Sequence, residues 1–214
     1  MPADDGVAHL RAADPILGSL IDRVGPLPAD EDEAESRGRP EDHYGALVRS
    51  IVGQQLSTKA ARAIYLRLTA RFDGRTPSPE QVLADDPEEL RAAAGLSRMK
   101  VSFLRSLAEH VQSGTLDLER IAELDDDEII SELVAVKGIG EWSAHMYLMF
   151  HLRRPDVLAW GDLGVRRAVQ QAYLLSEAPL RGELTELAEP WRPHRTLACR
   201  FLWRSLDATP VDGD

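Results

Sequence analysis

Apolar residues recur at three- and four-residue spacing along most of the chain, in segments such as GALVRSIV, AARAIYLRLTARF, KVSFLRSLAEHV and HRTLACRFLWRSL. This spacing is typical of helices that bury one face. No segment alternates apolar and polar residues in the manner of a half-buried strand rich in valine, isoleucine and threonine. The pattern therefore predicts an all-α fold of eight to ten helices joined by short loops.

Local signals mark several of the breaks between these helices. Ser97 is a predicted N-cap, Gly114 a predicted helix stop, and Asp125 begins the next helix. A turn containing Gly74, Pro77 and Pro79 follows a helix that we expect to end near Phe72.

Charge and helical pattern divide the chain into four stretches. Residues 1–43 combine an amphipathic helix at 7–24, expected to pack on the C-terminal part of the body, with an acidic linker rich in Pro, Gly and Ser. We expect residues 44–132 to form a six-helix lobe, residues 133–206 to form a hairpin and catalytic segment followed by C-terminal helices, and residues 207–214 to form an acidic tail.

The net charge of -11 over 214 residues is unevenly distributed. Residues 1–43 and 115–132 each carry -7, whereas residues 44–114 and 133–206 each carry +3. The acidity of the whole chain therefore does not exclude nucleic acid as a partner. No apolar run is long enough to cross a bilayer, and the N-terminus lacks the pattern of a signal peptide, which favours a cytoplasmic protein without membrane contact.

A single cysteine, Cys199, excludes an internal disulfide and sites that need several cysteines, such as iron-sulfur clusters and multi-cysteine zinc sites. Its apolar, helical surroundings favour a structural thiol. The six histidines form no metal-ligand spacing. We expect no transition metal and no organic cofactor.

Two glycines one residue apart, Gly138 and Gly140, interrupt the helical pattern in DDDEIISELVAV-KGIG-EWSAHMYLMFHL. GIGEWS nearly fits a dinucleotide-binding turn, but that turn follows a strand, and the segment before it has helical period. The arrangement instead predicts a helix, a hairpin and a second helix whose first amides bind a phosphate, with Lys137 as a further phosphate contact. A tight helix corner that binds nothing is the alternative.

The segment 133–169 resembles the helix-hairpin-helix and Gly/Pro-Asp signature of the DNA glycosylase superfamily, and in detail it is most similar to the bacterial 3-methyladenine DNA glycosylase II family. Further similar segments are DPILGSLIDRVGP, IVGQQLSTKAARAIYLRL, GLSRMKVSFLRSLA and PWRPHRTLACRFLW, so the resemblance covers most of residues 14–206. It implies a two-lobed helical bundle with a cleft between lobes, in a compact form without the β-rich N-terminal domain of larger members. It also implies a hydrolase of the EC 3.2.2.21 type that flips an alkylated purine out of double-stranded DNA.

The resemblance assigns Asp162 as the catalytic carboxylate. An anion in a partly desolvated site would stabilise the positive charge that develops on the sugar as the glycosidic bond breaks. Asp162 also precedes LGVRRAVQQAY, where it is a predicted N-cap, and both roles can hold together.

Glycosylases of this superfamily that also cut the strand use a lysine at the position that Trp142 occupies here. An indole cannot form a Schiff base, so we expect a monofunctional enzyme without AP lyase activity that leaves an abasic site. The resemblance further places Trp142, Met146, Tyr147 and Trp203 around the flipped base, where indole faces suit electron-poor alkylpurines. Met146 departs from the family, whose best-known member has an aromatic residue there, and burial in the core is the alternative role for the tryptophans.

The resemblance implies DNA contacts beyond the hairpin lysine. Gln54, Gln55 and Leu56 fall in a turn that fills the gap left by the flipped base; we favour Gln55 as the plug, then Leu56, and a helix-capping glutamine pair is the alternative. Gly138, Ile139 and Gly140 contact phosphate, and Arg166 is one of several arginines near Asp162 in the sequence.

The same resemblance implies a Na⁺ or K⁺ ion held by the backbone carbonyls of Val134, Val136 and Gly138. We expect a monomer. Two other functions stay open from the sequence: a glycosylase for deaminated or oxidised purines, and a DNA-binding protein of the helix-hairpin-helix type that performs no chemistry.

Overall fold

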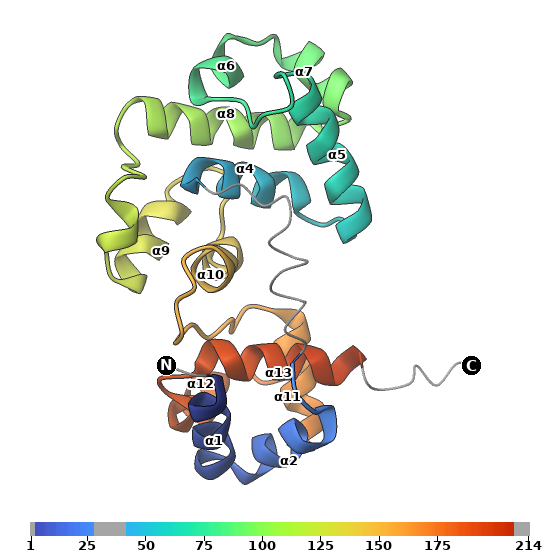
Figure 1. The fold of residues 1–214 in the computed structure, drawn as a ribbon, viewed down its shortest axis with the longest axis vertical. Helices are drawn as coiled ribbons and strands as arrows, with labels where there is room; N and C mark the ends of the chain where they lie inside the picture. The colour runs from blue at the N-terminus through green and yellow to red at the C-terminus, as the bar shows by residue number, and fades with distance from the viewer. Residues whose placement is uncertain (1–2, 28–41, 208–214) are drawn as a thin grey trace, which may run out of the picture. The chain divides into compact units, whose positions relative to one another are not determined.

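The computed structural model describes residues 3–27 and 42–207 (Figure 1). Every regular element among these residues is a helix, so the predicted all-α fold is confirmed. They form twelve α-helices, more than the eight to ten predicted, because three helices of six to eight residues are too short to show a helical period. The predicted linker beyond residue 27 and the tail beyond residue 207 lie outside the described residues.

The chain forms two compact units, and the division falls after Tyr147, inside α10 (Glu141–Phe150). The described residues 42–147 form the hairpin unit, and residues 3–27 with 148–207 form the aspartate unit. The sequence pattern placed a boundary after residue 132, whereas the structure keeps the glycine hairpin with the central helices.

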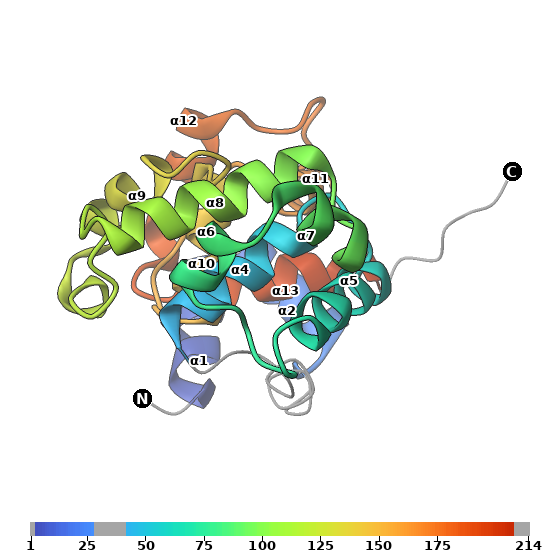
Figure 2. The ribbon, with the colours of Figure 1, turned by 90° about the horizontal axis from the view of Figure 1, so that it is seen from above.

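α4 and α8 contact each other at the centre of the hairpin unit, and α5, α6 and α7 pack on them and on one another (Figures 1 and 2). Its elements are α4 (His43–Gly53), α5 (Thr58–Ala70), α6 (Pro79–Ala84), α7 (Pro87–Ala94), α8 (Arg98–Gln112), η1 (Ile121–Glu123), α9 (Asp126–Val134) and most of α10. α6 and α7 both lie against α8, and α5 packs on α4 and α7. The interior is formed by apolar residues from these helices, including Leu47, Ile51, Leu104 and Leu107, which are almost wholly buried.

The aspartate unit joins the two ends of the chain. Its elements are α1 (Ala3–Ala13), α2 (Pro15–Val24), α11 (Leu163–Ala172), α12 (Arg181–Leu187), η2 (Glu189–Trp191) and α13 (Arg195–Asp207). α13 packs on α11 and α2, and α1 packs on α2 and η2. None of the helices in the described ranges combines the length and the apolar character that crossing a bilayer requires.

The single helix expected over residues 7–24 is wrong: the structure has two helices, broken at Asp14. Pro15 occupies the first turn of α2, where its missing N–H costs nothing, but it cannot continue α1. Asp14 is extended and its carboxylate accepts the amides of Ile16 and Leu17, both at 3.0 Å. The dipeptide Asp-Pro was thus a local stop signal that the apolar period concealed.

Asp14 also ties the N-terminal helices to the C-terminal ones. Its second carboxylate oxygen accepts the Trp191 indole N–H at 2.8 Å and the Tyr173 hydroxyl. Trp191 is fully buried and is therefore a core residue. A buried carboxylate with four donors is satisfied, and removing it would leave those donors without a partner.

Candidate functional site

The predicted site residues fall into two groups that the fold builds separately. The hairpin unit holds the glycine hairpin, the turn that follows α4, and the aromatic side of α10. The aspartate unit holds Asp162, Arg166 and Trp203.

The glycine hairpin comprises α9, the turn at residues 135–140, and α10. α9 begins at Asp126, and the predicted Asp125 is its N-cap and forms a capping box. The Ala144 amide donates to the Gly140 carbonyl at 3.0 Å, so the first turn of α10 starts at the second hairpin glycine. This helix start is electropositive and suits an anion such as phosphate.

The two hairpin glycines are required for different reasons. Gly138 has φ 94°, and a Cβ there would lie 2.1 Å from the Phe103 ring. A side chain at Gly138 is therefore excluded by the protein itself. A Cβ at Gly140 would meet nothing within 4 Å, so this glycine leaves open space in front of the turn. Of these two glycines, Gly138 is the one that the packing of the protein itself explains.

A tight turn joins α4 to α5, and we call residues 53–56 the wedge turn. The Leu56 amide donates to the Gly53 carbonyl at 3.2 Å, and Gln54 has φ -51° and ψ 132°. Gln55 follows with φ 57°, as at the third position of a type II turn, which glycine or asparagine usually occupies. Gln55 and Leu56 are both exposed. A glutamine held in the left-handed region is the kind of backbone strain that clusters at functional sites.

Gln54 lies differently from its neighbour. Its side-chain amide donates to the Gly138 carbonyl at 2.8 Å and to the Ser143 hydroxyl at 3.3 Å. Gln54 thus joins the wedge turn to the glycine hairpin across 84 residues of sequence. The side-chain amide nitrogen of Gln54 is thus used in bonds within the protein. Of the three residues in this turn that were predicted to contact DNA, Gln55 and Leu56 are the exposed ones.

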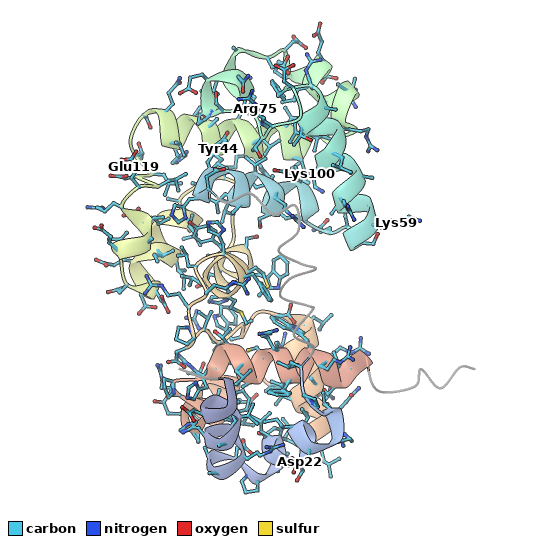
Figure 3. All side chains as sticks on the ribbon, viewed as in Figure 1. Asp22, Tyr44, Lys59, Arg75, Lys100 and Glu119 are labelled. Atoms are coloured by element: carbon cyan, nitrogen blue, oxygen red, sulfur yellow. The ribbon has the colours of Figure 1, made fainter. Side chains whose placement is uncertain are left out.

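Lys100 bonds to the end of α4 directly before the wedge turn, and sequence reasoning did not single it out. Its ammonium donates to the Val52 carbonyl at 2.7 Å, at the end of α4 (Figure 3). Partial burial lowers the pKa of Lys100. The only advance signal was its place in GLSRMK, one of the segments that carried the family resemblance.

The residues of α10 that were predicted to line a base pocket differ in exposure. Trp142 is 42% exposed, and Met146, one turn later on the same face, is half-buried. Tyr147 is 4% exposed and its hydroxyl is 2.7 Å from Nδ1 of His43, so it packs inside the hairpin unit. Burial raises the pKa of Tyr147. Trp142 is therefore the exposed aromatic residue of α10, whereas Tyr147 is buried in the hairpin unit.

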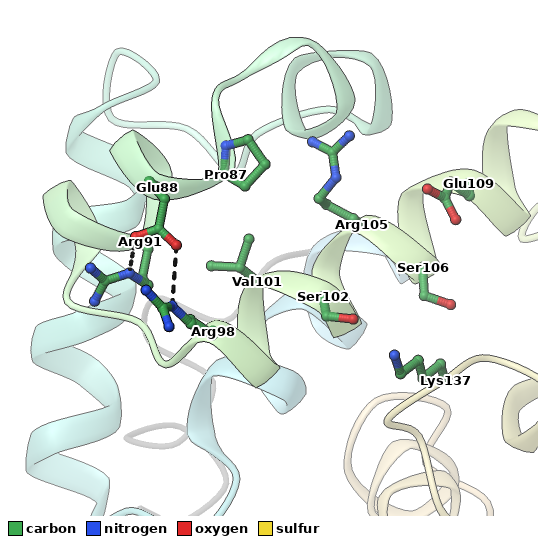
Figure 4. Close-up of a pocket in the computed structure, with 10 residues that line it drawn as sticks. All are labelled: Pro87, Glu88, Arg91, Arg98, Val101, Ser102, Arg105, Ser106, Glu109 and Lys137. Carbon is green, nitrogen blue, oxygen red and sulfur yellow. Dashed lines mark hydrogen bonds and ion pairs between the residues drawn. The ribbon is translucent and has the colours of Figure 1, made fainter.

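Two other hairpin residues are also placed by the structure. The Ile139 side chain is 4% exposed, so only its backbone could touch DNA. Lys137 is exposed, and its side chain lies along a groove on α8 (Figure 4).

Asp162 caps α11, as its position in the sequence predicted. Its Oδ1 accepts the Val165 amide at 2.9 Å and the Trp203 indole N–H at 2.7 Å. The residue is partly exposed. Two donors fix the carboxylate in one orientation while leaving the residue accessible, which is the arrangement that an electrostatic catalyst needs.

Trp203 therefore binds Asp162 directly, a role that the sequence did not reveal. Its ring also stacks on Phe150, with centroids 5.9 Å apart. Gly164 makes this contact possible, because a Cβ there would lie 3.0 Å from both Asp162 Oδ1 and the Trp203 ring. Gly164 was missed in the sequence, where a glycine in the first turn of an otherwise good helix was the available signal.

The loop that leads to Asp162 is anchored on the start of α13. The Thr196 hydroxyl accepts the Val157 amide at 3.0 Å and donates to the Arg154 carbonyl at 2.7 Å. Nearby, the Arg195 guanidinium donates to the Asp156 carboxylate at 2.7 and 3.0 Å. These contacts hold the backbone just before the aspartate, so its position depends on α13 as well as on α11.

Cys199 is fully buried in α13. Burial, with a smaller contribution from the Asp162 charge, raises the pKa of its thiol to about 12. A thiol in that state is not a nucleophile at neutral pH, in agreement with the structural role predicted for it.

Arg166 is held within the aspartate unit. Its guanidinium donates to the Pro179 carbonyl at 2.8 Å and to the Ala178 carbonyl at 3.4 Å. These contacts give Arg166 a structural role in fixing the loop after α11, so we leave it out of the DNA interface proposed below.

The carbonyls expected to hold an alkali cation are partly engaged. The Val136 carbonyl accepts the Ile139 amide at 3.0 Å, and the Gly138 carbonyl accepts the Gln54 amide. Each oxygen keeps a second lone pair, and neutral oxygens suit Na⁺ or K⁺, so the donor chemistry fits the ion. Across the described residues, no group of three or more His, Cys, Asp or Glu side chains could hold a metal.

Comparison with known proteins places these features in a family. Residues 48–193 match the family described as HhH-GPD superfamily base excision DNA repair protein. DNA-3-methyladenine glycosylase 1 of Schizosaccharomyces pombe is 36% identical over 164 residues, which are 76% of this chain and 72% of that protein.

Two solved structures are similar over nearly the whole chain. One is the S. pombe 3-methyladenine DNA glycosylase in complex with abasic DNA, with a TM-score of 0.78 and 31% identity over 94% of this chain and 95% of that one. The other is a DNA-3-methyladenine glycosidase from Bacillus halodurans, with a TM-score of 0.77 and 37% identity over 94% of this chain and 88% of that one.

Proposed function

Because this chain belongs to the HhH-GPD superfamily of base excision DNA repair proteins, we propose that it is a DNA-3-methyladenine glycosylase. It binds double-stranded DNA, flips out an alkylated purine and hydrolyses the N-glycosidic bond. The observation that carries this proposal is the Asp162 carboxylate, partly exposed and held by two donors, in a chain 36% identical to a 3-methyladenine glycosylase.

The reaction needs a negative charge beside the sugar. When the bond from C1′ to the purine nitrogen breaks, both electrons leave with the base and positive charge develops on the sugar. Asp162 stabilises that charge. A cationic alkylpurine becomes a neutral base because it takes both electrons of the broken bond. The oxygen of a water molecule then bonds to C1′ and the water releases a proton to solvent, which leaves an abasic site.

Trp142 determines which product we expect. It offers an exposed indole face on which an electron-poor purine can stack, and it has no amine that could attack the sugar. We therefore propose that the enzyme is monofunctional and leaves the strand intact.

The hairpin unit supplies the DNA contacts in this proposal. The start of α10, open in front of Gly140, binds a backbone phosphate, and a Na⁺ or K⁺ ion at the turn carbonyls would add positive charge there. Gln55 at the tip of the wedge turn fills the gap in the base stack, with Leu56 beside it. We further propose that the protein acts as a monomer in the cytoplasm.

Product analysis tests the proposed function. DNA treated with a methylating agent is incubated with the protein, and released bases are separated by chromatography. We expect 3-methyladenine and 7-methylguanine. Duplexes that carry a deaminated or oxidised purine are assayed in the same way. Release of these bases alone would show a different substrate class, and tight DNA binding without release of any base would show a non-catalytic protein.

Borohydride trapping tests the monofunctional claim. A Schiff base between protein and sugar becomes a stable cross-link on reduction, so we expect no cross-linked band and an unbroken strand after excision. A covalent adduct would show that an amine attacks the sugar and would overturn the role assigned to Trp142.

A further inference from the structure

A groove of about 440 Å³ runs along one face of α8 (Figure 4). We call it the α8 groove. The start of α7 borders one end, where Pro87 and Glu88 lie, and Lys137 of the glycine hairpin borders the other. The groove therefore begins at the residue directly before the hairpin glycines and continues away from them within the hairpin unit.

Four of the residues that line the groove are cationic: Arg91, Arg98, Arg105 and Lys137. The lining holds two carboxylates, Glu88 and Glu109, so cations exceed anions by two in a chain whose net charge is -11. Such a local excess of positive charge suits a polyanion.

The cations have different partners. Glu88 accepts from Arg91 at 2.7 Å and from Arg98 at 3.3 Å, and these two guanidinium groups lower the pKa of its carboxyl. One carboxylate thus faces two arginines, and the Arg98 side chain is 82% exposed. Within the described part of the chain, the Lys137 ammonium makes no hydrogen bond or ion pair.

Arg105 contributes a positive charge to the groove, and its acceptors are backbone carbonyls rather than carboxylates. Its guanidinium donates at 3.1–3.3 Å to three backbone carbonyls of residues 82, 83 and 85, which fix its position but leave its positive charge uncompensated. Ser102 and Ser106 line the groove between Arg105 and Lys137 (Figure 4). Ser106 is buried, and the hydroxyl of the half-buried Ser102 can donate to a phosphate oxygen.

We propose that the α8 groove holds backbone phosphates of the same DNA strand that contacts the glycine hairpin, extending the interface from Lys137 to Arg98. The proposal rests on the proposed function, because it requires a DNA-binding hairpin. From Arg98 to Glu109 the helix rises about 16 Å, and one strand of DNA carries a phosphate about every 3.4 Å of axis. The groove is long enough for several phosphates beside the lesion.

The charges predict substitutions of opposite sign. Arg98→Gln removes a cation that faces the phosphates, whereas Glu109→Gln removes an anion that repels them. Arg75→Gln is the matched control, because Arg75 is exposed in the same unit but does not line the groove (Figure 3). All three changes lie on the surface, and thermal unfolding checks that each variant is folded.

The experiment measures the affinity of each protein for a labelled duplex carrying a tetrahydrofuran abasic-site analogue, as a function of salt. Losing one phosphate contact lowers the slope of log K against log salt by about 0.9. Arg98→Gln should show that change in slope. The ratio of the parent's affinity for DNA to that of Arg98→Gln should therefore fall about threefold between about 50 and 200 mM salt. Glu109→Gln should bind more tightly than the parent, and Arg75→Gln should match the parent.

Duplexes cut short on one side of the analogue locate the contact. We expect one of the two truncations to abolish the difference between the parent and Arg98→Gln, because it removes the phosphates that the groove holds. Equal salt slopes for the parent and Arg98→Gln, or an equal effect of Arg75→Gln, would overturn the proposal.

A small phosphate compound is the other possible source of the same chemistry. Inorganic pyrophosphate that binds the parent but not Arg98→Gln, with unchanged salt slopes for DNA, would make this a small-anion site and overturn the DNA proposal. Base release by the parent is measured beside these assays. If the parent neither binds the duplex nor releases methylpurines, the proposed function is refuted. If the parent does both, but Arg98→Gln and Glu109→Gln bind DNA as the parent does, only the proposal for the α8 groove is refuted.

Discussion

At the scale of single residues, Gly138 and Gly140 show that the same residue type one position apart can serve different purposes. Gly138 satisfies a backbone with φ 94° and leaves room for the Phe103 ring. Gly140 faces open space, so its lack of a side chain matters for what approaches from outside. The sequence pattern assigned both glycines to phosphate binding. That Gly138 is required by packing could not be predicted, because the ring it packs against belongs to Phe103, 35 residues earlier.

Alanine at each glycine separates the two roles. We expect Gly138→Ala to destabilise the protein by at least about 2 kcal/mol, because it adds both backbone strain and a clash in a packed interior. Gly140→Ala should leave the unfolding temperature nearly unchanged but weaken binding to abasic-site DNA. Thermal unfolding and DNA affinity measured on both variants test this, and equal stability of the two variants would contradict it.

Trp203 is a second residue whose role depends on a contact that the sequence could not show. Trp203→Phe keeps an aromatic ring to stack on Phe150 but removes the N–H donor to Asp162. We expect the single-turnover excision rate to fall by about tenfold, since one oriented donor is lost from the carboxylate. If Trp203 only stacks on the base, Trp203→Phe should instead raise the DNA concentration needed for half-maximal rate and leave the saturated rate unchanged.

At the scale of elements, the wedge turn and the glycine hairpin are joined by a hydrogen bond. Gln54 bonds to the turn of the hairpin, and Lys100 bonds to the end of α4. The strained Gln55 lies next to both supports. The proposed plug residue, Gln55, and the proposed phosphate site at the start of α10 therefore belong to segments that are bonded to each other.

Removing the Gln54 amide tests this coupling. Gln54→Ala should cost about 1 kcal/mol of stability, as for one neutral hydrogen bond, but should slow excision of a paired lesion more than excision of the same lesion opposite a gap. Flipping is easier opposite a gap, so the plug contributes less there. A uniform loss on both substrates would mean that Gln54 is merely structural.

One contact that should make stability depend on acid pH joins Arg71, which follows α5, to Asp85, which follows α6. The Arg71 guanidinium donates to both oxygens of Asp85 at 2.6 Å and holds the pKa of that carboxyl below its usual value of 3.8. Because the folded pKa is depressed, this stabilisation is fully present above about pH 4 and is lost as the pH falls through the folded pKa.

Asp85→Asn should therefore lower the urea midpoint of unfolding at pH 7, and the gap to the parent should close as the pH drops below the usual Asp pKa. Urea titrations at pH 7, 5 and 3.5 measure it. A gap that is constant with pH would exclude the Asp85 charge as its source.

At the scale of the whole molecule, the sequence predicted those features that depend on local signals. The all-α class, the caps at Ser97 and Asp125, and the capping position of Asp162 all follow from a few neighbouring residues. The family resemblance supplied the reaction, which no periodicity could indicate.

The features that could not be predicted depend on partners far away in the sequence. Tyr147 was expected at the base pocket but is buried against His43, 104 residues earlier. Gln54 was expected at the DNA but reaches Gly138. Trp203 lies 41 residues from Asp162, and nothing in its own segment indicates which carboxylate it binds. The neighbouring residues in the sequence do not show whether such a side chain faces solvent or contacts a distant partner. Only the packed structure distinguishes the two cases.

The central claim is that Asp162 performs glycosidic hydrolysis in this chain, and the excision rate of Asp162→Asn tests it most directly. Asparagine keeps the size and an oxygen that can accept from Val165 and Trp203, but it carries no charge. Single-turnover release of 7-methylguanine should fall at least about a hundredfold, while affinity for abasic-site DNA stays within a few-fold of the parent. Equal release by the parent and Asp162→Asn would contradict the account.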